Sequence, residues 1–447
     1  MEIAIKLSQF LLSLSLLIIL HELGHFIPAK LFKTRVEKFY LFFDIKFSLL
    51  KKKIGETEYG IGWLPLGGYV KISGMIDESM DKEQMALPPQ PWEFRSKPAW
   101  QRLIIMLGGV AVNFVLAFVI YIGMTFYYGE LYLKNSELKD GIAVTSKVGE
   151  ELGFKTGDKI IAIDGETVSR FNEVPNKLLF AKNVTLARDG AQQTIDLPID
   201  LIKKVMGGEK RPFIGWREPF AVGLVDDKSA NKNNLKPKDI VLRMGEQSTP
   251  YMDQVIAYAE AHKGQIVSAV ILRNEVETPV NIKINAQGKI GVYQAHLSVE
   301  SLQKLGIYQF TEQHYSFFES IPVGLQKGKD QVLGYGKQLK AIFNPETGAY
   351  KGVGGFKAIF DIFPKTWSWE VFWSITAILS IMLGVMNLLP IPALDGGHVV
   401  FLLYEIVSGK KPSDKFLENA QMVGFVLLIT LLVFANGNDI YKAIVGK

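Results

Sequence analysis

Apolar residues form four stretches, each close to the length of a bilayer-spanning helix. They run roughly over residues 7–31, 103–128, 371–389 and 416–435, and the middle of the chain has the pattern of a soluble protein. A spanning helix needs about 20 predominantly apolar residues. The pattern therefore predicts four transmembrane helices, although the clean apolar core of the fourth, 422–435, is short.

A cleaved signal peptide is the alternative interpretation of the first stretch. Its amino-terminal part carries Lys6 as its one basic side chain, and the stretch lacks a small-residue cleavage site. We therefore expect the stretch to stay in the protein as its first span.

Basic residues are concentrated in two of the loops between the predicted spans. The loop between spans one and two is rich in Lys and Arg, and the short loop between spans three and four contains Lys410, Lys411 and Lys415. The positive-inside rule places both loops in the cytoplasm. The large central region then lies outside, which in a bacterial inner membrane is the periplasmic side.

The central region, about 134–294, contains an internal repeat. Residues 157–166 (GDKIIAIDGE) are echoed by residues 237–246 (PKDIVLRMGE), with similar β-rich runs following each copy. Two copies about eighty residues apart predict tandem small domains. The pattern resembles the PDZ domain, which binds a peptide by adding a strand to a sheet edge, and residues 141–144 are placed like its carboxylate-binding loop. Two generic β-rich domains without a ligand are the alternative.

The segment 301–369 mixes aromatic and basic residues at helical spacing. This pattern predicts either an amphipathic helix on the membrane surface, in contact with lipid, or a plain helical linker.

Composition adds limits to this picture. The chain has 447 residues, more than one ordinary core, and its mean hydropathy of +0.16 is high for a soluble protein. A net charge of only +5 gives no reason to expect a nucleic-acid partner. The absence of Cys excludes disulfides, thiolate zinc sites and Cys nucleophiles, so a metal would need His, Asp or Glu ligands.

Candidate chemistry lies within the first span, where His21-Glu22-Leu23-Gly24-His25 forms an H-E-x-x-H motif. On a helix, this spacing puts two imidazoles one turn apart on one face, where both can bind a zinc ion. Glu22 is then placed as general base for the attacking water. A polar helix end at the membrane interface is the alternative, but unpartnered ionisable groups in lipid are costly.

Catalytic zinc usually has three protein ligands, so a third must come from elsewhere at membrane depth. The best candidate is Asp395, which follows Pro390 and Pro392 where the third span is broken. A helix-capping role for Asp395 and metal binding by His398 instead remain open from spacing alone.

Together these motifs resemble the site-2 protease family of intramembrane zinc metalloproteases, in its regulator-of-sigma-E protease branch. The resemblance covers nearly the whole chain: H-E-x-x-H in span one, the PDZ-like pair, and N-x-x-P-x-P-x-L-D-G after span three. It implies that His21, His25 and Asp395 bind Zn²⁺, that Glu22 is catalytic and that Asn387 contacts substrate.

The resemblance also implies that residues 55–72 form the family's membrane-associated β-loop. We expect Gly60, Ile61 and Gly62 to bind substrate there, as part of an edge strand over 58–63 that pairs with an opened helix backbone. An ordinary β-hairpin is the alternative.

The sequence thus predicts a polytopic α-helical membrane protein with about four transmembrane helices, a membrane-associated β-loop and two inserted PDZ-like α+β domains. Its segments are span one with the zinc motif (1–32), a cytoplasmic-side loop with the β-hairpin (33–99), span two (100–130), the two PDZ-like domains (131–212 and 213–300), an amphipathic linker (301–369), span three with the Asp motif (370–400), and span four with the tail (401–447).

The predicted function is intramembrane zinc endopeptidase, with the zinc site near the cytoplasmic leaflet. Expected substrates are transmembrane proteins or peptides, such as anti-sigma factors or remnant signal peptides, and peptide C-termini are candidate ligands of the PDZ-like pair. One alternative is a membrane-anchored zinc protease with a soluble catalytic domain, for which Glu56 or Glu58 would be the third ligand. The other is a membrane-anchored PDZ scaffold without protease activity.

Overall fold

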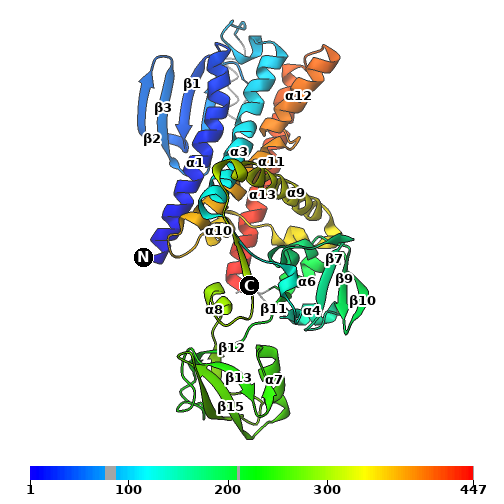
Figure 1. The fold of residues 1–447 in the computed structure, drawn as a ribbon. Coiled ribbons are helices and arrows are strands. Elements are labelled where there is room, and N and C mark those ends of the chain that lie inside the picture. The colour runs from blue at the N-terminus through cyan, green and yellow to red at the C-terminus, as the bar shows by residue number, and fades with distance from the viewer. Residues whose placement is uncertain (76–86, 209–211, 446–447) are drawn as a thin grey trace. The chain divides into compact units, whose positions relative to one another are not determined.

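The computed structural model describes residues 1–75, 87–208 and 212–445 (Figure 1). The chain divides into two compact units. The first unit comprises residues 1–129, 314–342 and 351–447, and the second comprises residues 130–313 and 343–350. Each unit is described by itself below.

The first unit is mainly helical, and its described residues form four helices long and apolar enough to cross a membrane. The prediction of four spans is confirmed at this level. These helices are α1 (Glu2–Leu31), α3 (Ala99–Tyr128), α11 (Trp369–Leu388) and α13 (Asp414–Val445). The described part of this unit also contains α9 (Phe317–Phe343), α10 (Phe356–Asp361) and α12 (Asp395–Ser408).

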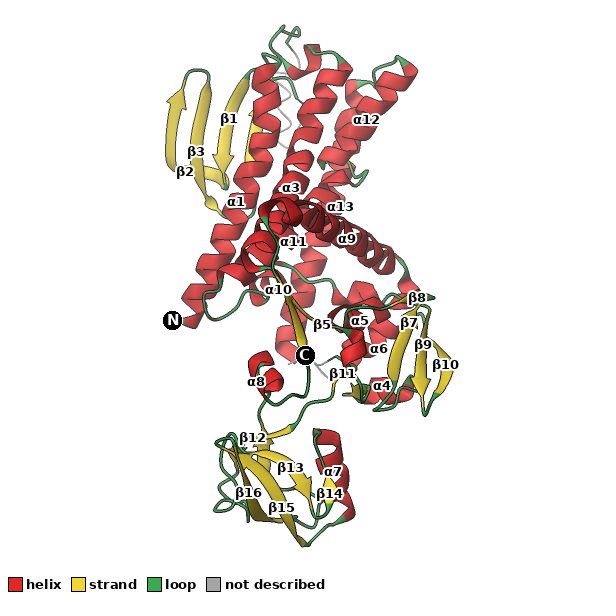
Figure 2. Cartoon of the chain, in the orientation of Figure 1, coloured by secondary structure: helices red, strands yellow, loops and turns green. Residues whose placement is uncertain are grey.

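Helix α3 packs against α1, α11 and α12 (Figure 2). The crossing with α1 is close because two glycines meet there. A Cβ on Gly24 would lie 2.6 Å from the carbonyl carbon of Gly108, and a Cβ on Gly108 would clash with the Gly24 carbonyl oxygen. Small residues let helix backbones approach closely in membranes. Because Gly24 belongs to the H-E-x-x-H motif, the crossing holds the motif against α3.

A four-stranded sheet follows α1 in the first unit. Its strands are β1 (Val36–Leu41), β2 (Phe43–Ile54), β3 (Thr57–Leu64) and β4 (Tyr69–Ile72), in the order β2-β3-β1-β4. Strand β3 is parallel to β1 and antiparallel to β2. The expectation of an edge strand over 58–63 is therefore wrong, because Gly60 and Ile61 pair with both β1 and β2, and Gly62 pairs with Ser48 of β2. Among the described strands, the edges of this sheet are β2 and β4.

A proline turn separates α11 from α12 and presents Asp395 as the first residue of α12. The predicted break of the third span is confirmed, since α11 ends at Leu388. Helix α12 is a separate element that ends at Ser408 and is capped by Gly409, which has a left-handed φ of 67°. The segmentation at 400/401 is therefore wrong, because it cuts through α12.

The second unit contains two β-rich parts, each with its own apolar core. The first part contains β5 (Glu130–Leu133), β6 (Ile142–Val144), α4 (Lys147–Glu151), β7 (Lys159–Ile163), β8 (Glu166–Thr167), α5 (Val174–Leu178), β9 (Asn183–Arg188), β10 (Ala191–Asp196), α6 (Leu201–Gly207) and β11 (Ile214–Trp216). The second part contains β12 (Phe220–Val225), β13 (Ile240–Met244), β14 (Gln247–Ser248), α7 (Met252–Ala261), β15 (Ile266–Arg273), β16 (Val276–Lys283) and β17 (Val292–Gln294).

The internal repeat recurs as a structural repeat built around a buried ion pair. In the first copy, Asp158 accepts hydrogen bonds of 2.7 Å from Nε and from one terminal nitrogen of Arg188. In the second copy, Asp239 accepts the equivalent bonds from Arg273 at 2.9 and 2.6 Å. Both carboxylates are 1% exposed. The two β-rich parts therefore share an equivalent Asp–Arg ion pair, in agreement with the repeat seen in the sequence.

The segment after the second β-rich part is less uniformly helical than predicted for 301–369. It contains α8 (Val299–Lys304) and β18 (Phe310–Gln313) before α9 begins. Strand β18 pairs with β5, far away in the sequence. The prediction of a purely helical linker is wrong in this part, because the chain returns to complete a two-stranded sheet.

Candidate metal centre

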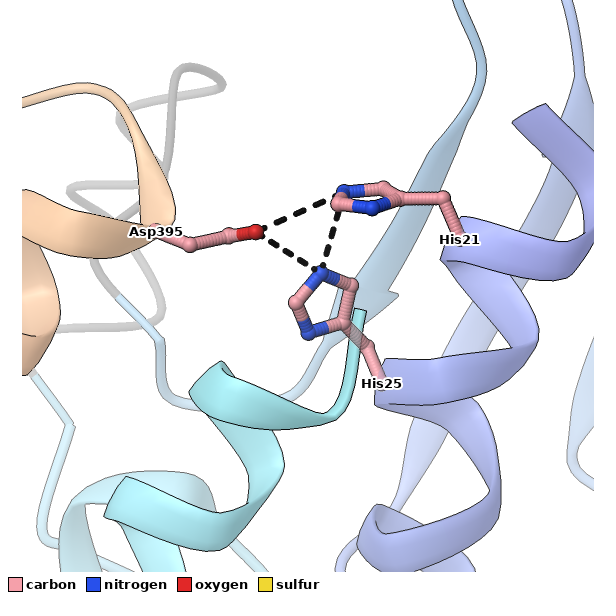
Figure 3. A group of neighbouring side chains, drawn as sticks. All are labelled: His21, His25 and Asp395. Atoms are coloured by element: carbon pink, nitrogen blue, oxygen red, sulfur yellow. Dashed lines mark hydrogen bonds and ion pairs between the residues drawn. The ribbon is translucent and has the colours of Figure 1, made fainter. Parts of the chain in front are cut away.

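Three predicted ligands meet in the first unit (Figure 3). His21 and His25 lie on one face of α1, and Asp395 comes from the start of α12. Oδ2 of Asp395 is 3.4 Å from Nε2 of His21 and 3.3 Å from Nε2 of His25, and the two Nε2 atoms are 3.3 Å apart. Their side chains are 9–14% exposed. The structure therefore brings residues from two helices that are far apart in the sequence, α1 and α12, into one compact group.

The geometry of this group fits a tetrahedral metal ion. Zinc bonds of about 2.0–2.1 Å separate the ligand atoms of a tetrahedral site by about 3.3–3.4 Å, which matches the triangle of nitrogen and oxygen atoms. Oδ2 of Asp395 is also buried without a hydrogen-bond partner in the described structure. A buried carboxylate oxygen is costly unless something pairs with it, and a cation at the centre of the triangle would do so.

Groups on α3 orient both imidazoles. Nδ1 of His25 lies 2.8 Å from the carbonyl oxygen of Ile105, so Nδ1–H donates there and Nε2 is free to bind a metal. Nδ1 of His21 lies 2.9 Å from the side-chain amide of Asn113. Between them, Gly109 makes room, since a Cβ there would clash with Nε2 of His25 and lie 2.8 Å from Cε1 of His21.

Two other predicted site residues lie beside this group. Nδ2 of Asn387 is 3.4 Å from Nε2 of His21. Glu22 follows His21 on α1, and a Cβ on Gly68 would lie 3.6 Å from its Cγ and 2.5 Å from Cγ2 of Ile18. The residue just before β4, Gly68, therefore lies next to Glu22.

Several rival or predicted residues are not part of the group. The group of possible metal ligands found among the described residues does not include His398 or Glu58. His398 instead lines a cavity with Arg102, Glu405 and Gln421, and Glu58 accepts a hydrogen bond of 2.7 Å from the Tyr40 hydroxyl. The glycines of β3 pack into the sheet, where a Cβ on Gly60 would clash with the Tyr40 ring.

Tyr69, at the start of β4, is held as a hydrogen-bond donor. Its hydroxyl donates to Asp44 at 2.8 Å and its ring stacks on Tyr40. Burial raises the pKa of Tyr69, and the bond to Asp44 raises it further. Burial also raises the pKa of Asp44, but the bond from Tyr69 and the charge of Lys38 outweigh burial and lower it overall. The pair therefore stays charged on Asp44 and neutral on Tyr69, which fixes this end of β4.

Sequence reasoning did not predict that Gly109 and Asn113 contact the histidines. A signal was available, because an Asn within an apolar span is expensive unless it has a partner. The spacing of Gly109 and Asn113 also puts them on one face of α3, towards whatever that face contacts.

Comparison with known proteins agrees with this geometry. The family model of peptidase family M50 matches residues 9–431. The regulator of sigma E protease of Haemophilus influenzae is 29% identical over 471 residues, which cover 98% of this chain and 99% of that protein. A candidate zinc metalloprotease of Rickettsia conorii is 26% identical over 444 residues, covering 96% of this chain and 97% of that protein. The chain therefore belongs to peptidase family M50, the site-2 protease family of zinc metalloproteases.

Proposed function

We propose that this protein is an intramembrane endopeptidase that cuts transmembrane segments of other membrane proteins. The observation that carries the proposal is the position of the ligand group. Two of its members lie inside α1, a helix with the length and hydropathy of a membrane span, and the third follows α11, another such helix. A site built this way supports hydrolysis at membrane depth.

In this proposal His21, His25 and Asp395 hold the zinc ion. Zinc bound there supplies a Lewis acid that polarises the scissile carbonyl and makes the attacking water more acidic. Glu22 accepts a proton from that water and returns it to the leaving amine nitrogen. The hydrogen bond between His25 and Ile105 keeps Nε2 directed at the metal during these steps.

The substrate needs a place to unfold, because a helical peptide bond is shielded by its own hydrogen bonds. We propose that the opened segment adds to β4 rather than to β3. The outer edge of β4 pairs with no strand among the described residues, and the preceding Gly68 lies beside Glu22. A segment bound along β4 would therefore pass the general base, and Asn387 can hydrogen-bond its freed backbone groups.

Contact with lipid is supported by the outward residues of the sheet. Ile45, Phe47, Leu50 and Trp63 are 42–67% exposed, and the Phe47 and Trp63 rings stack. Exposed apolar patches of this kind mark membrane or protein contacts. With the loop charges, they support an inner-membrane protein whose sheet and zinc site are near the cytoplasmic leaflet and whose central domains are periplasmic.

The two central domains are proposed as PDZ-like filters that exclude substrates with bulky external parts. In the first domain, β6 pairs with β11 on one side, and Ile142 exchanges backbone hydrogen bonds of 2.8 Å with Gly157 and Asp158 on the other. In the second, β12 pairs with both β13 and β17. These occupied strand edges favour exclusion over capture of peptide C-termini by strand addition.

The relative named regulator of sigma E protease suggests a substrate class. Membrane-spanning anti-sigma factors, already trimmed outside by another protease, are proposed as substrates, together with remnant signal peptides. A reporter with a folded external domain should be cut poorly, and the same reporter without that domain should be cut well.

The central test uses purified wild-type protein, Glu22→Gln and Asp395→Asn in bilayer discs with a membrane-spanning reporter. Glu22→Gln should bind zinc and lose nearly all cleavage. Asp395→Asn should lose both zinc and cleavage. Cleavage by Glu22→Gln at the wild-type rate would exclude this mechanism. If the wild-type protein itself does not cleave the reporter, the membrane-anchored scaffold is the better description.

A further inference from the structure

The turn that presents Asp395 is conformationally demanding. Between α11 and α12, Ala393 has a φ of +78°, a left-handed region that non-glycine residues enter at a cost. The turn is held by hydrogen bonds from Ile391 N–H to Leu389 and from Leu394 N–H to Ile391, of 2.7 and 3.0 Å. Neither bond involves the Ala393 N–H, so its partner must come from elsewhere.

That partner is Gln421, near the beginning of α13. Oε1 of Gln421 accepts a hydrogen bond of 3.1 Å from the Ala393 N–H. One turn later, Gly424 touches the same turn, since a Cβ there would clash with the Pro392 carbonyl. Positions 421 and 424 share a helix face, so α13 meets the proline turn through this face.

The contact is distinctive because α13 buries few residues. Among the described residues of α13, those that are buried are Gln421, Gly424 and Asp439. Gln421 is 5% exposed, and a buried amide in an apolar helix is costly unless it is bonded. The bond to Ala393 offsets that cost and also satisfies a backbone donor at the strained residue.

The position of Asp395 depends directly on this turn. The first turn of α12 rests on it, because a Cβ on Gly396 would clash with the Leu389 carbonyl oxygen, and one on Gly397 would lie 2.5 Å from the Ile391 carbonyl oxygen. No space is left between helix and turn, so a change in the turn moves Asp395. Its Oδ2 must stay near 3.3 Å from both histidine nitrogens to complete the group.

We infer that Gln421 is a positioning residue for the metal centre. It acts through Ala393: by holding the left-handed turn, it keeps Asp395 within reach of His21 and His25. This inference rests on the proposed role of Asp395 as a zinc ligand. Gln421 touches neither substrate nor metal in this scheme.

The test measures zinc affinity of the full-length protein in bilayer discs by competition with a chelator, with no substrate present. Gln421→Leu keeps the bulk of the side chain and removes the acceptor, and it should weaken zinc binding about 10- to 100-fold, as loss of a supporting contact typically does. Gln421→Glu keeps an acceptor oxygen at the same reach and should stay within about threefold of wild type. Thr430→Val is the matched control, because the side-chain hydrogen bond that Thr430 makes among the described residues stays within α13, to Val426 at 2.8 Å.

A second arm separates positioning from general stability. Glycine enters the left-handed region freely, so adding Ala393→Gly to Gln421→Leu should recover part of the lost zinc affinity. Recovery would not follow if Gln421→Leu merely loosened the packing of α13. The shorter Gln421→Asn replaces Gln421→Leu if the latter does not fold, and it should show the same loss.

Wild-type zinc affinity in Gln421→Leu, or an equal loss in Thr430→Val, would overturn the inference. Asp395→Asn is measured in parallel. If Asp395→Asn keeps its zinc, the proposed ligand set is wrong. If it loses zinc while Gln421→Leu keeps it, only the role of Gln421 is wrong.

Discussion

Asn113 and His21 form a contact that decides which nitrogen of His21 can bind metal. The side-chain nitrogen of Asn113 lies 2.9 Å from Nδ1 of His21, while Oδ1 of Asn113 is buried without a hydrogen-bond partner among the described residues. The two ends of an amide have nearly the same shape. With the amide turned over, Oδ1 accepts the proton of Nδ1 of His21, and the unprotonated Nε2 of His21 is directed at Asp395.

This relationship predicts the effect of two substitutions at Asn113. Asn113→Leu leaves the Nδ1–H of His21 without an acceptor, so zinc affinity should fall about 10- to 100-fold. Asn113→Asp keeps an acceptor oxygen and should hold zinc nearly as well as wild type. Chelator competition measures both values.

The control for this pair is Thr376→Val. It removes the buried bond of 2.9 Å between Ser13 and Thr376, which joins spans without touching the ligands. Thr376→Val should lower the unfolding temperature and leave zinc affinity unchanged. Equal zinc affinity in Asn113→Leu and wild type would contradict the assignment.

Gly109 should be intolerant of any side chain. In Gly109→Ala, the new Cβ would clash with Nε2 of His25 and lie 2.8 Å from Cε1 of His21, and overpacking of this kind costs about 1–3 kcal/mol. Both imidazoles would have to move, so bound zinc should fall at least about tenfold.

The matched control for Gly109→Ala lies on the same helix. A Cβ on Gly123 would meet nothing within 4 Å, so Gly123→Ala should keep full metal content. Metal analysis after gel filtration measures both variants. Full metal content in Gly109→Ala would show that the histidines can move without losing the ion.

Local pattern in the sequence predicts much of the site and only part of the fold. His21 and His25 are one helical turn apart, so their meeting follows from α1 alone, and Asp395 is marked by the prolines before it. The spans follow from the length of apolar runs. Each of these inferences depends on residues that are neighbours in sequence.

The parts that sequence reasoning got wrong depend on distant pairing. The sequence of β3 fits a hairpin strand whether or not β1 pairs with its other side. The parallel pairing of Lys38 with Glu58 leaves no signal in the residues next to either one in the sequence. The same holds for β5 and β18. The end of α12 is different: Gly409 followed by Pro412 is a helix stop signal that could have been used.

The buried ion pairs of the repeat predict where local stability resides in the central domains. Asp158→Asn leaves Arg188 without its charge partner in a site where the carboxylate is 1% exposed, and breaking a buried pair costs about 3–5 kcal/mol. Hydrogen exchange of the intact protein should show faster exchange in β7 and β9 and unchanged exchange in β13 and β15.

Asp227→Asn serves as the control for this change, because its partner Lys232 is exposed and its own side chain is 90% exposed. Exposed pairs contribute little, so exchange should stay as in wild type. Faster exchange in both β-rich parts after Asp158→Asn would mean that the two parts unfold together.

The outer edge of β4, which pairs with no strand among the described residues, predicts an alternating response to proline. In an antiparallel pair, successive residues direct their N–H and C=O groups alternately towards the partner strand and away from it. One of Val70 and Lys71 therefore faces β1 and the other faces outward. Proline at the outward position removes one donor that a bound substrate strand would use, so kcat/KM for the membrane-spanning reporter should fall about threefold to tenfold at unchanged zinc content. Proline at the inward position breaks the ladder with β1 and should lower the unfolding temperature as well. If neither substitution changes kcat/KM while both proteins stay folded, the substrate does not pair with β4.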